Sequence, residues 1–317
     1  MTGTHLHSRE QAYLLARSCD VWREKSDACR AGLAYGETTI TERLLLEMVR
    51  SYPGVAEVLP YTPRQEADTG ADWLWCIQDS RGKAVRLFAM LVQAKRLDMS
   101  RDSYVHLDHV VGEGGTKRPQ IDKLIETATR RGYVPAYLFY NHSSPKGAFD
   151  ADLNPMLFKC PTVDTLRDQS LRGGQWGIAV AHAEAVRDRM NSAVVGKRPG
   201  RTALGRHLPI SIPLHCLLCP SAVPDGSLRS VPEVVAMRME RLRMDPSVDE
   251  RKGADEDAVG MFDEVPPVVA LLRKLRRSDD ATTRERVAAE VAERHPDLAG
   301  AVVLHSREKP DRLDPRR

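Results

Sequence analysis

Three polar residues in the first third of the chain have the types and spacing of a phosphodiester-cleaving site. Asp72 stands at the start of one apolar run, and Gln93 and Lys95 stand at the end of the next, 21 and 23 residues later. Side chains alternate along a strand, so Gln93 and Lys95 point to one face and Ala94 points to the other. If the two runs form an antiparallel hairpin through a turn at 78–82, Asp72 lies beside Gln93 and Lys95 at an exposed edge of the sheet.

This trio suits metal-assisted hydrolysis. The carboxylate of Asp72 and the amide carbonyl of Gln93 are hard oxygen ligands for Mg²⁺, or for Mn²⁺ in its place. The metal polarises the phosphoryl group and generates the nucleophile, while Lys95 stabilises or positions the attacking water. We therefore predict Asp72 and Gln93 as metal ligands and Lys95 as the catalytic cation.

Two acids at the head of an expected helix, Glu37 and Glu42, are candidates for a further catalytic carboxylate. The sequence Thr39-Ile40-Thr41-Glu42 has the form of a capping box, in which Glu42 would instead satisfy a backbone N–H. Glu37 has the alternative of an ordinary loop acid. Glu66, just upstream of Asp72, is a weaker third candidate. Spacing alone leaves this choice open.

The elements that must position these residues form the series helix, strand, strand, helix, strand. Helical spacing covers residues 9–33 and restarts near Thr39, and the run from Val85 to Val92 is apolar enough for a central strand. A helix at 119–131 and a buried strand at 134–140 follow. The later pattern predicts a strand at 176–181 that leads into a helix, an irregular stretch at 192–226, helices at 231–244, 265–277 and 282–294, and a strand at 301–305.

With this order of elements the chain resembles the PD-(D/E)XK restriction-endonuclease-like nucleases. Their core is a helix, a three-strand meander, a helix and a further strand, and their signature is an Asp followed by acid-x-Lys on the next strand. Asp72 matches the Asp, Lys95 matches the Lys, and Gln93 takes the acid position. Gln-x-Lys is similar to the variant in restriction enzymes directed at methylated DNA. Glu37 or Glu42 would match the family's helical Glu, and the family's Pro-Asp pair is missing.

The resemblance implies an α/β fold, a Mg²⁺- or Mn²⁺-dependent endonuclease activity on DNA, and a role in bacterial defence. RNA is an alternative substrate, and a homodimer is one option for the assembly. The Gln in place of an acid supports another interpretation, a degraded site in a module that binds nucleic acid or protein. Residues 37–141 are also similar to uncharacterised bacterial proteins with GADW and VQAKRL segments. We expect an N-terminal helical segment at 1–34, the nuclease-like core at 35–190 and an accessory region at 191–317.

Basic residues provide candidate contacts to phosphates. Lys117 and Arg118 precede Gln120, which begins the expected second helix, where backbone N–H groups can bind an anion. The segment 187–206 holds six basic side chains against one acid. Its alternative is a solvated surface loop, as Lys117 and Arg118 can also simply face water. The candidates chosen from this segment are Lys197, Arg198 and Arg201.

Cys216 and Cys219 form a CxxC, which is half of a zinc motif. Cys160 or His207 would have to complete it through the tertiary fold. Apolar neighbours favour a buried structural segment instead.

Composition limits the remaining classes of protein. No run approaches the ~18 apolar residues of a membrane span, and the first residues show no signal peptide. Six cysteines in 317 residues do not make a disulfide framework, so we expect a reducing cytoplasm. Aromatic residues make up 5%, which argues against stacking platforms for single strands. The net charge of +3 predicts no nucleic-acid partner by itself.

Overall fold

The computed structural model describes residues 9–51, 56–60, 73–79, 86–98, 100–112, 117–142, 173–192, 200–219, 230–244, 259–295 and 298–306. Its helices are α1 (Arg9–Arg30), α2 (Glu37–Ser51), α3 (Gln120–Arg130), η3 (Gln175–Gly177), α6 (Ala183–Asn191), α7 (Leu204–His207), η4 (Leu208–Ile210), α8 (Leu214–Leu217), α9 (Val231–Arg243), α10 (Pro267–Arg277) and α11 (Ala281–Arg294). Its strands are β1 (Ala56–Pro60), β2 (Trp73–Asp79), β3 (Arg86–Arg96), β4 (Val110–Val111), β5 (Arg118–Pro119), β6 (Val134–Tyr140), β7 (Ile178–His182), β8 (Ser211–Pro213), β9 (Met261–Phe262) and β10 (Gly300–Ser306).

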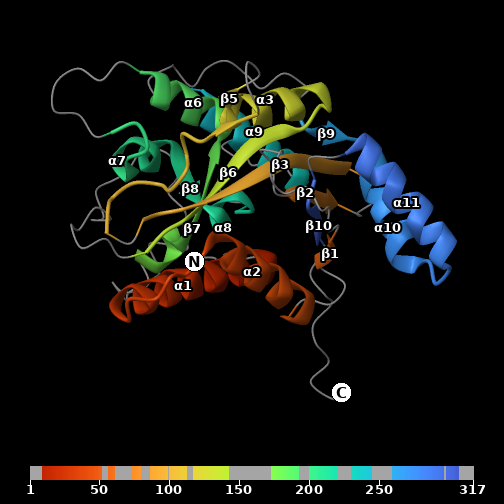
Figure 1. The fold of residues 1–317 in the computed structure, drawn as a ribbon, viewed down its shortest axis with the longest axis horizontal. Helices are drawn as coiled ribbons and strands as arrows, with labels where there is room; N and C mark the ends of the chain where they lie inside the picture. Colours follow the sequence, from red (N-terminus) through yellow and green to blue (C-terminus); the bar gives the residue numbers. More distant parts are fainter. Residues whose placement is uncertain are drawn as a thin grey trace, which may run out of the picture.

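A mixed eight-stranded sheet forms the centre of the structure (Figure 1). Seven strands lie in the order β1, β10, β2, β3, β6, β7, β8, and β9 pairs with the start of β3. β2 and β3 are antiparallel, whereas β3 and β6 are parallel and α3 connects them. The predicted α/β class, with N-terminal helices and a mainly helical C-terminal region, is confirmed.

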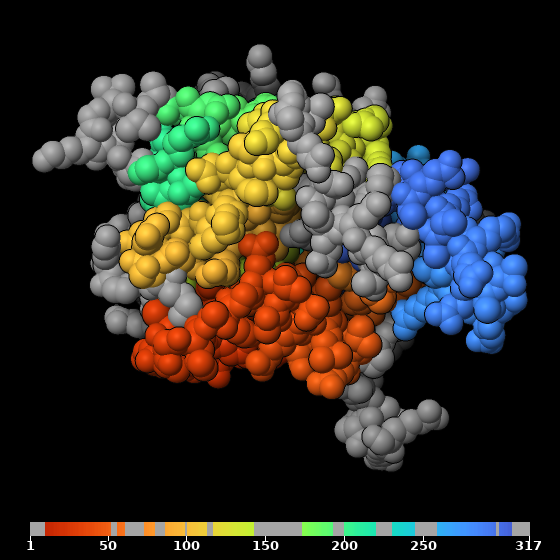
Figure 2. All heavy atoms as spheres, viewed as in Figure 1, coloured from red at the N-terminus to blue at the C-terminus, as the bar shows by residue number. Residues whose placement is uncertain are grey.

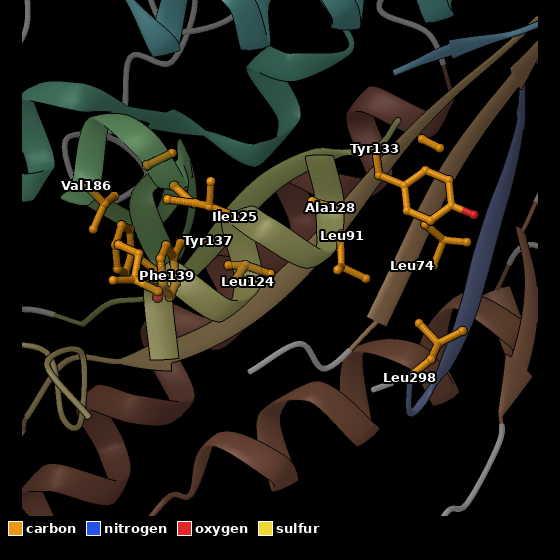
Figure 3. Close-up of a cluster of buried hydrophobic side chains, with 14 of the residues drawn as sticks. Leu74, Leu91, Leu124, Ile125, Ala128, Tyr133, Tyr137, Phe139, Val186 and Leu298 are labelled. Carbon is orange, nitrogen blue, oxygen red and sulfur yellow. The ribbon is translucent and has the colours of Figure 1, made fainter. Parts of the chain in front are cut away.

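Helices cover both faces of this sheet. The odd-numbered residues Leu87, Ala89 and Leu91 of β3 pack under α3, α6, α10 and α11, on what we call the α3 face. The even-numbered residues Phe88 and Met90 pack under α1, α2, α8 and α9, on the α1 face. Figure 3 shows part of the α3-face core, where side chains of α3, β2, β3 and β6 meet.

The sequence explains α3 locally. Ile121, Leu124, Ile125 and Ala128 recur at the spacing of one helical face, and all four are buried. Gly132 follows with a φ of 70°, a left-handed conformation that glycine adopts without strain. The predicted helix and its stop are therefore confirmed, and β6 begins two residues later.

Two local predictions around the motif are wrong. α2 begins at Glu37, and Ile40 N donates to Gly36 O at 3.1 Å, so Thr39 lies inside the first turn and cannot cap the helix. The expected turn at 78–82 starts too early, because Gln78 and Asp79 continue β2 and pair with Leu87 and Arg86. Residues 80–85 lie outside the described part.

The segment predicted to be irregular at 192–226 is largely ordered between 204 and 217. It forms α7, η4, β8 and α8, and β8 adds the last strand to the sheet beside β7. Leu204, Ile210, Ile212 and Leu214 are all buried. Burial of these apolar side chains outweighs the local preference of proline and glycine for loops.

Candidate functional site

Gln93 and Lys95 lie in the interior of the sheet. Only 1% of Gln93 and 5% of Lys95 is exposed, and both point to the α3 face, as alternation along β3 requires. The expected exposed edge is wrong, because β3 continues its pairing with β6 past the motif. Lys95 lies opposite Phe139, and Arg96 lies opposite Tyr140.

The ammonium group of Lys95 has a neutral partner. Its Nζ donates a hydrogen bond to Oε1 of Gln120 at 3.0 Å. Gln120 is the first residue of α3, and its backbone N–H donates to the carbonyl oxygen of His109 at 2.9 Å, which fixes the start of the helix. Among the described residues no carboxylate lies within ion-pair distance of Lys95. The sequence placed Gln120 among phosphate contacts, whereas the structure brings it to the catalytic candidate.

The amide oxygen of Gln93 has no hydrogen-bond partner among the described residues. Oε1 is buried, and no hydrogen-bond donor reaches it in the part of the chain that the structure describes. A buried acceptor without a donor is destabilising by about 1–3 kcal/mol. Such an oxygen is suited to accept a cation, so Gln93 fits the predicted role of an oxygen ligand.

Several predicted residues lie outside the described part: Asp72, Glu66, Lys197, Arg198 and Cys160. For Asp72 the neighbouring residue is informative. Trp73 pairs with Val92, the residue before Gln93, so the start of β2 does lie beside the motif in β3. The predicted antiparallel hairpin is thus confirmed at its described end.

The structure does not join either helical acid to the motif. Glu37 and Glu42 belong to α2, which packs on the α1 face, and neither bonds to Gln93 or Lys95. Glu42 is exposed on this helix. Glu37 stands at its first turn and lies near Lys25, where its charge offsets a small part of the lowering of the lysine pKa by burial.

The basic candidates are in different surroundings. Lys117 is exposed, and Arg118 forms an ion pair with Glu126 on α3. Arg201 donates from Nε to the carbonyl oxygen of Met190, at the end of α6, at 3.2 Å. Of the predicted nucleic-acid contacts that the structure describes, only Gln120 bonds to Lys95.

Sequence reasoning missed Lys25, which is fully buried in α1. Its Nζ donates to the carbonyl oxygen of Leu97, just after the motif, at 3.3 Å. Burial, with a smaller contribution from the charge of Arg96, lowers the pKa of Lys25 to about 8. The signal was present, since Lys25 continues the spacing of the buried residues Ser18 and Val21.

The CxxC belongs to a buried segment, as its apolar neighbours indicated. Cys216 and Cys219 are buried with Leu214 and Leu217, and Sγ of Cys216 lies 3.5 Å from Nε2 of His215. None of the five described cysteines forms a disulfide. Within the described residues no three His, Cys, Asp or Glu side chains gather in a geometry that could hold a metal ion.

Comparisons with known proteins place the chain in a family. No helix in the described residues is long and apolar enough to cross a membrane. No curated protein and no solved structure matches the chain significantly. Residues 10–310 match a family of unknown function, and this range includes every element of the sheet. The chain therefore belongs to the family DUF6615.

Proposed function

We propose that this protein is a metal-dependent nuclease that hydrolyses phosphodiester bonds of DNA. The observation that carries the proposal is a pair of buried polar groups on one face of β3. Among the described residues, the ammonium group of Lys95 has no carboxylate partner, and the amide oxygen of Gln93 has no hydrogen-bond donor. Apolar residues would pack better at both positions, so the fold gains nothing from these two groups.

Lys95 is available to an anion. A buried cation is normally held by a carboxylate, which neutralises it. Gln120 instead offers a neutral oxygen, which orients the ammonium and leaves its charge uncompensated. The remaining N–H groups of Lys95 can then donate to a phosphate oxygen or to the attacking water.

Gln93 and Asp72 are the proposed ligands of the metal. Trp73, the residue after Asp72 in the sequence, pairs with Val92, which directly precedes Gln93. A carboxylate and an amide oxygen are ligands that Mg²⁺ and Mn²⁺ accept. When bound, such a cation supplies Lewis acidity and lowers the pKa of water.

Plasmid cleavage in Mg²⁺, with EDTA as the blank, tests this function. Lys95→Met should lower the cleavage rate on the order of a hundredfold or more, the usual effect of losing one electrostatic stabiliser of the transition state. Lys25→Met is the matched control, because Lys25 is also buried but lies on the α1 face. It should cut as the wild type does.

Thermal unfolding of both variants confirms that each is folded. Equal cleavage by the Lys95→Met variant and the wild type would refute the proposed site.

The second candidate function is a binding module with the same fold and no catalysis. The neutral Gln93, in a position where the resembled nucleases carry an acid, favours it. The same assay separates the two functions: a binding module retains DNA and cuts it with neither Mg²⁺ nor Mn²⁺.

A further inference from the structure

Three arginines gather at the C-terminal end of α6. Arg189 belongs to the last turn of this helix. Arg201 donates to the carbonyl oxygen of Met190, and Arg206 donates from Nη2 to the carbonyl oxygen of Ser192, both at 3.2 Å. The two loop arginines thus come back to the helix end from α7 and the residues before it. We call these three residues the arginine cluster.

No carboxylate of the described residues neutralises the positive charge of the arginine cluster. Within this part of the chain none of its members forms an ion pair, and Arg189 makes no hydrogen bond through its side chain. The neighbouring acid, Asp188, is exposed and lies 3.8 Å from Arg187. Cations at a helix C-terminus are favourable by themselves, which explains one bond each for Arg201 and Arg206. It does not explain the buried Nη1 of Arg206, which has no hydrogen-bond partner among the described residues.

His207 contacts the backbone of Arg201 and is affected by the charges of Arg206 and Arg189. This histidine is buried, and its Nε2 bonds to the carbonyl oxygen of Arg201 at 2.8 Å. Burial lowers the pKa of His207 to about 4, and the charges of Arg206 and Arg189 lower it as well. Both guanidinium groups are therefore within electrostatic reach of one ring, and the ring itself is neutral at pH 7.

The fold ties the arginine cluster to the candidate active site. Tyr104 N donates to Thr202 O at 2.9 Å, and Leu204 N donates to Asp102 O at 2.8 Å. These bonds join the loop after β3 to the segment that carries Arg201 and Arg206. Figure 2 shows the two segments in contact, near residue 100 in gold and near residue 200 in green.

The distance between the two sites follows from the packing beneath them. Phe139 lies opposite Lys95 in the sheet, and its ring centroid is 6.1 Å from that of His207, the residue after Arg206. Adjacent strands add about 4.8 Å. The arginine cluster is therefore on the order of 10–15 Å from Lys95, which is the rise of about three to four base pairs along the axis of a duplex.

We propose that Arg189, Arg201 and Arg206 bind backbone phosphates of duplex DNA, a few nucleotides from the phosphodiester bond at Lys95. This inference rests on the proposed nuclease function for its choice of ligand. Guanidinium groups donate two parallel hydrogen bonds to a phosphate, and three uncompensated groups in one place favour a polyanion over a single carboxylate.

Binding of a fluorescent DNA duplex in EDTA, over a range of salt concentrations, tests the arginine cluster without any cleavage. Arg189→Gln and Arg206→Gln should each weaken binding about three- to tenfold and should lower the slope of log affinity against log salt by about one. Arg189→Lys should keep the slope, because it keeps the charge. Arg189 makes no side-chain hydrogen bond, so Arg189→Gln should fold even if Arg206→Gln does not.

Arg284→Gln is the control with the same change in charge. Arg284 is exposed on α11 and forms no ion pair, and α11 and α7 lie at opposite ends of the molecule in Figure 1. Its affinity and salt slope should match those of the wild type. If Arg189→Gln and Arg206→Gln also match the wild type, the arginine cluster does not bind phosphate. If they weaken binding of an RNA hairpin but not of the duplex, the assignment to DNA is wrong.

The binding assay and the cleavage assay distinguish failure of the arginine cluster from failure of the nuclease site. Normal cleavage by Lys95→Met, together with weakened binding by the Arg189 variant, would reject the nuclease site and keep the arginine cluster. The opposite pair of results would keep the nuclease site and reject the arginine cluster.

Discussion

At the scale of single residues, Gln93 differs from the rest of β3 because its buried oxygen has no partner. The chain offers a matched residue, Gln78 in β2, whose Oε1 is also buried and without a partner. Gln78 lies five positions after Trp73 in β2, so it is about 16 Å from the start of this strand. A structural role alone would make the two glutamines equivalent.

Gln93→Leu and Gln78→Leu should therefore have the same effect on stability but different effects on activity. Each removes a desolvated acceptor, and each should raise the free energy of unfolding by up to about 2 kcal/mol in urea titrations. Only Gln93→Leu should abolish plasmid cleavage. Full activity in the Gln93→Leu variant would show that this oxygen is not a ligand.

Gln93→Glu extends the same prediction to the metal. It preserves the length of the side chain and adds one negative charge, and charge helps to set the affinity of oxygen-ligand sites. The Mg²⁺ concentration for half-maximal cleavage should fall. An unchanged Mg²⁺ titration would contradict the assignment.

At the scale of secondary-structure elements, α1 lies so close to the segment around η3 that only glycine fits between them. A Cβ atom at Gly177 would overlap the carbonyl oxygen of Ser18 and lie 2.8 Å from the backbone N of Trp22. A Cβ atom at Gly173 would lie 2.9 Å from the ring of Trp22. The sequence alone predicted α1 as a separate N-terminal segment, whereas the structure packs it directly against η3, which leads into β7.

Gly177→Ala should displace α1 and lower the free energy of unfolding by about 3 kcal/mol or more, since backbone atoms cannot move aside as a side chain can. Gly205→Ala is the control: a Cβ there meets nothing within 4 Å, and α7 gains helix propensity. Its stability should stay equal or rise slightly. Chemical denaturation of the two variants decides, and equal stability would show that α1 is not held at this point.

At the scale of the whole molecule, the strand nearest the C-terminus lies inside the sheet, next to its β1 edge. β10 lies between β1 and β2, antiparallel to the first and parallel to the second. Ala301, Val302 and Val303 are fully buried there. Strands from both sides of residue 190, where the expected core ends and the accessory region begins, therefore share one sheet. The start of β2, beside Gln93, pairs with a strand from the last part of the chain.

A chain that ends at Leu298 should fail to fold. Losing β10 removes two buried valines, whose burial is worth about 1.5–3 kcal/mol each, and leaves the facing edges of β1 and β2 unpaired. The sum is comparable with the whole stability of a domain. A chain that ends at Ser306 keeps the strand and should unfold cooperatively. Circular dichroism and thermal melts compare the two, and a native-like melt from the shorter chain would contradict this role of β10.

The features that can be predicted from the amino-acid sequence are those that depend on neighbours a few residues apart. The apolar run of β3, the shared face of Gln93 and Lys95, the buried stripe of α3 and its stop at Gly132 all follow from periods of two or 3.6 residues. Local geometry sets these periods, so each can be read before any tertiary contact is known.

Contacts between distant segments are visible in the three-dimensional structure and not in the sequence. The tertiary structure placed β10 inside the sheet, turned α2 and its acids to the α1 face, buried the segment at 204–217 and gave Lys95 the side chain of Gln120 as its partner. No local period encodes these pairings. They depend on which apolar faces cover one another once the chain has closed its long loops, and that closure is a property of the whole molecule.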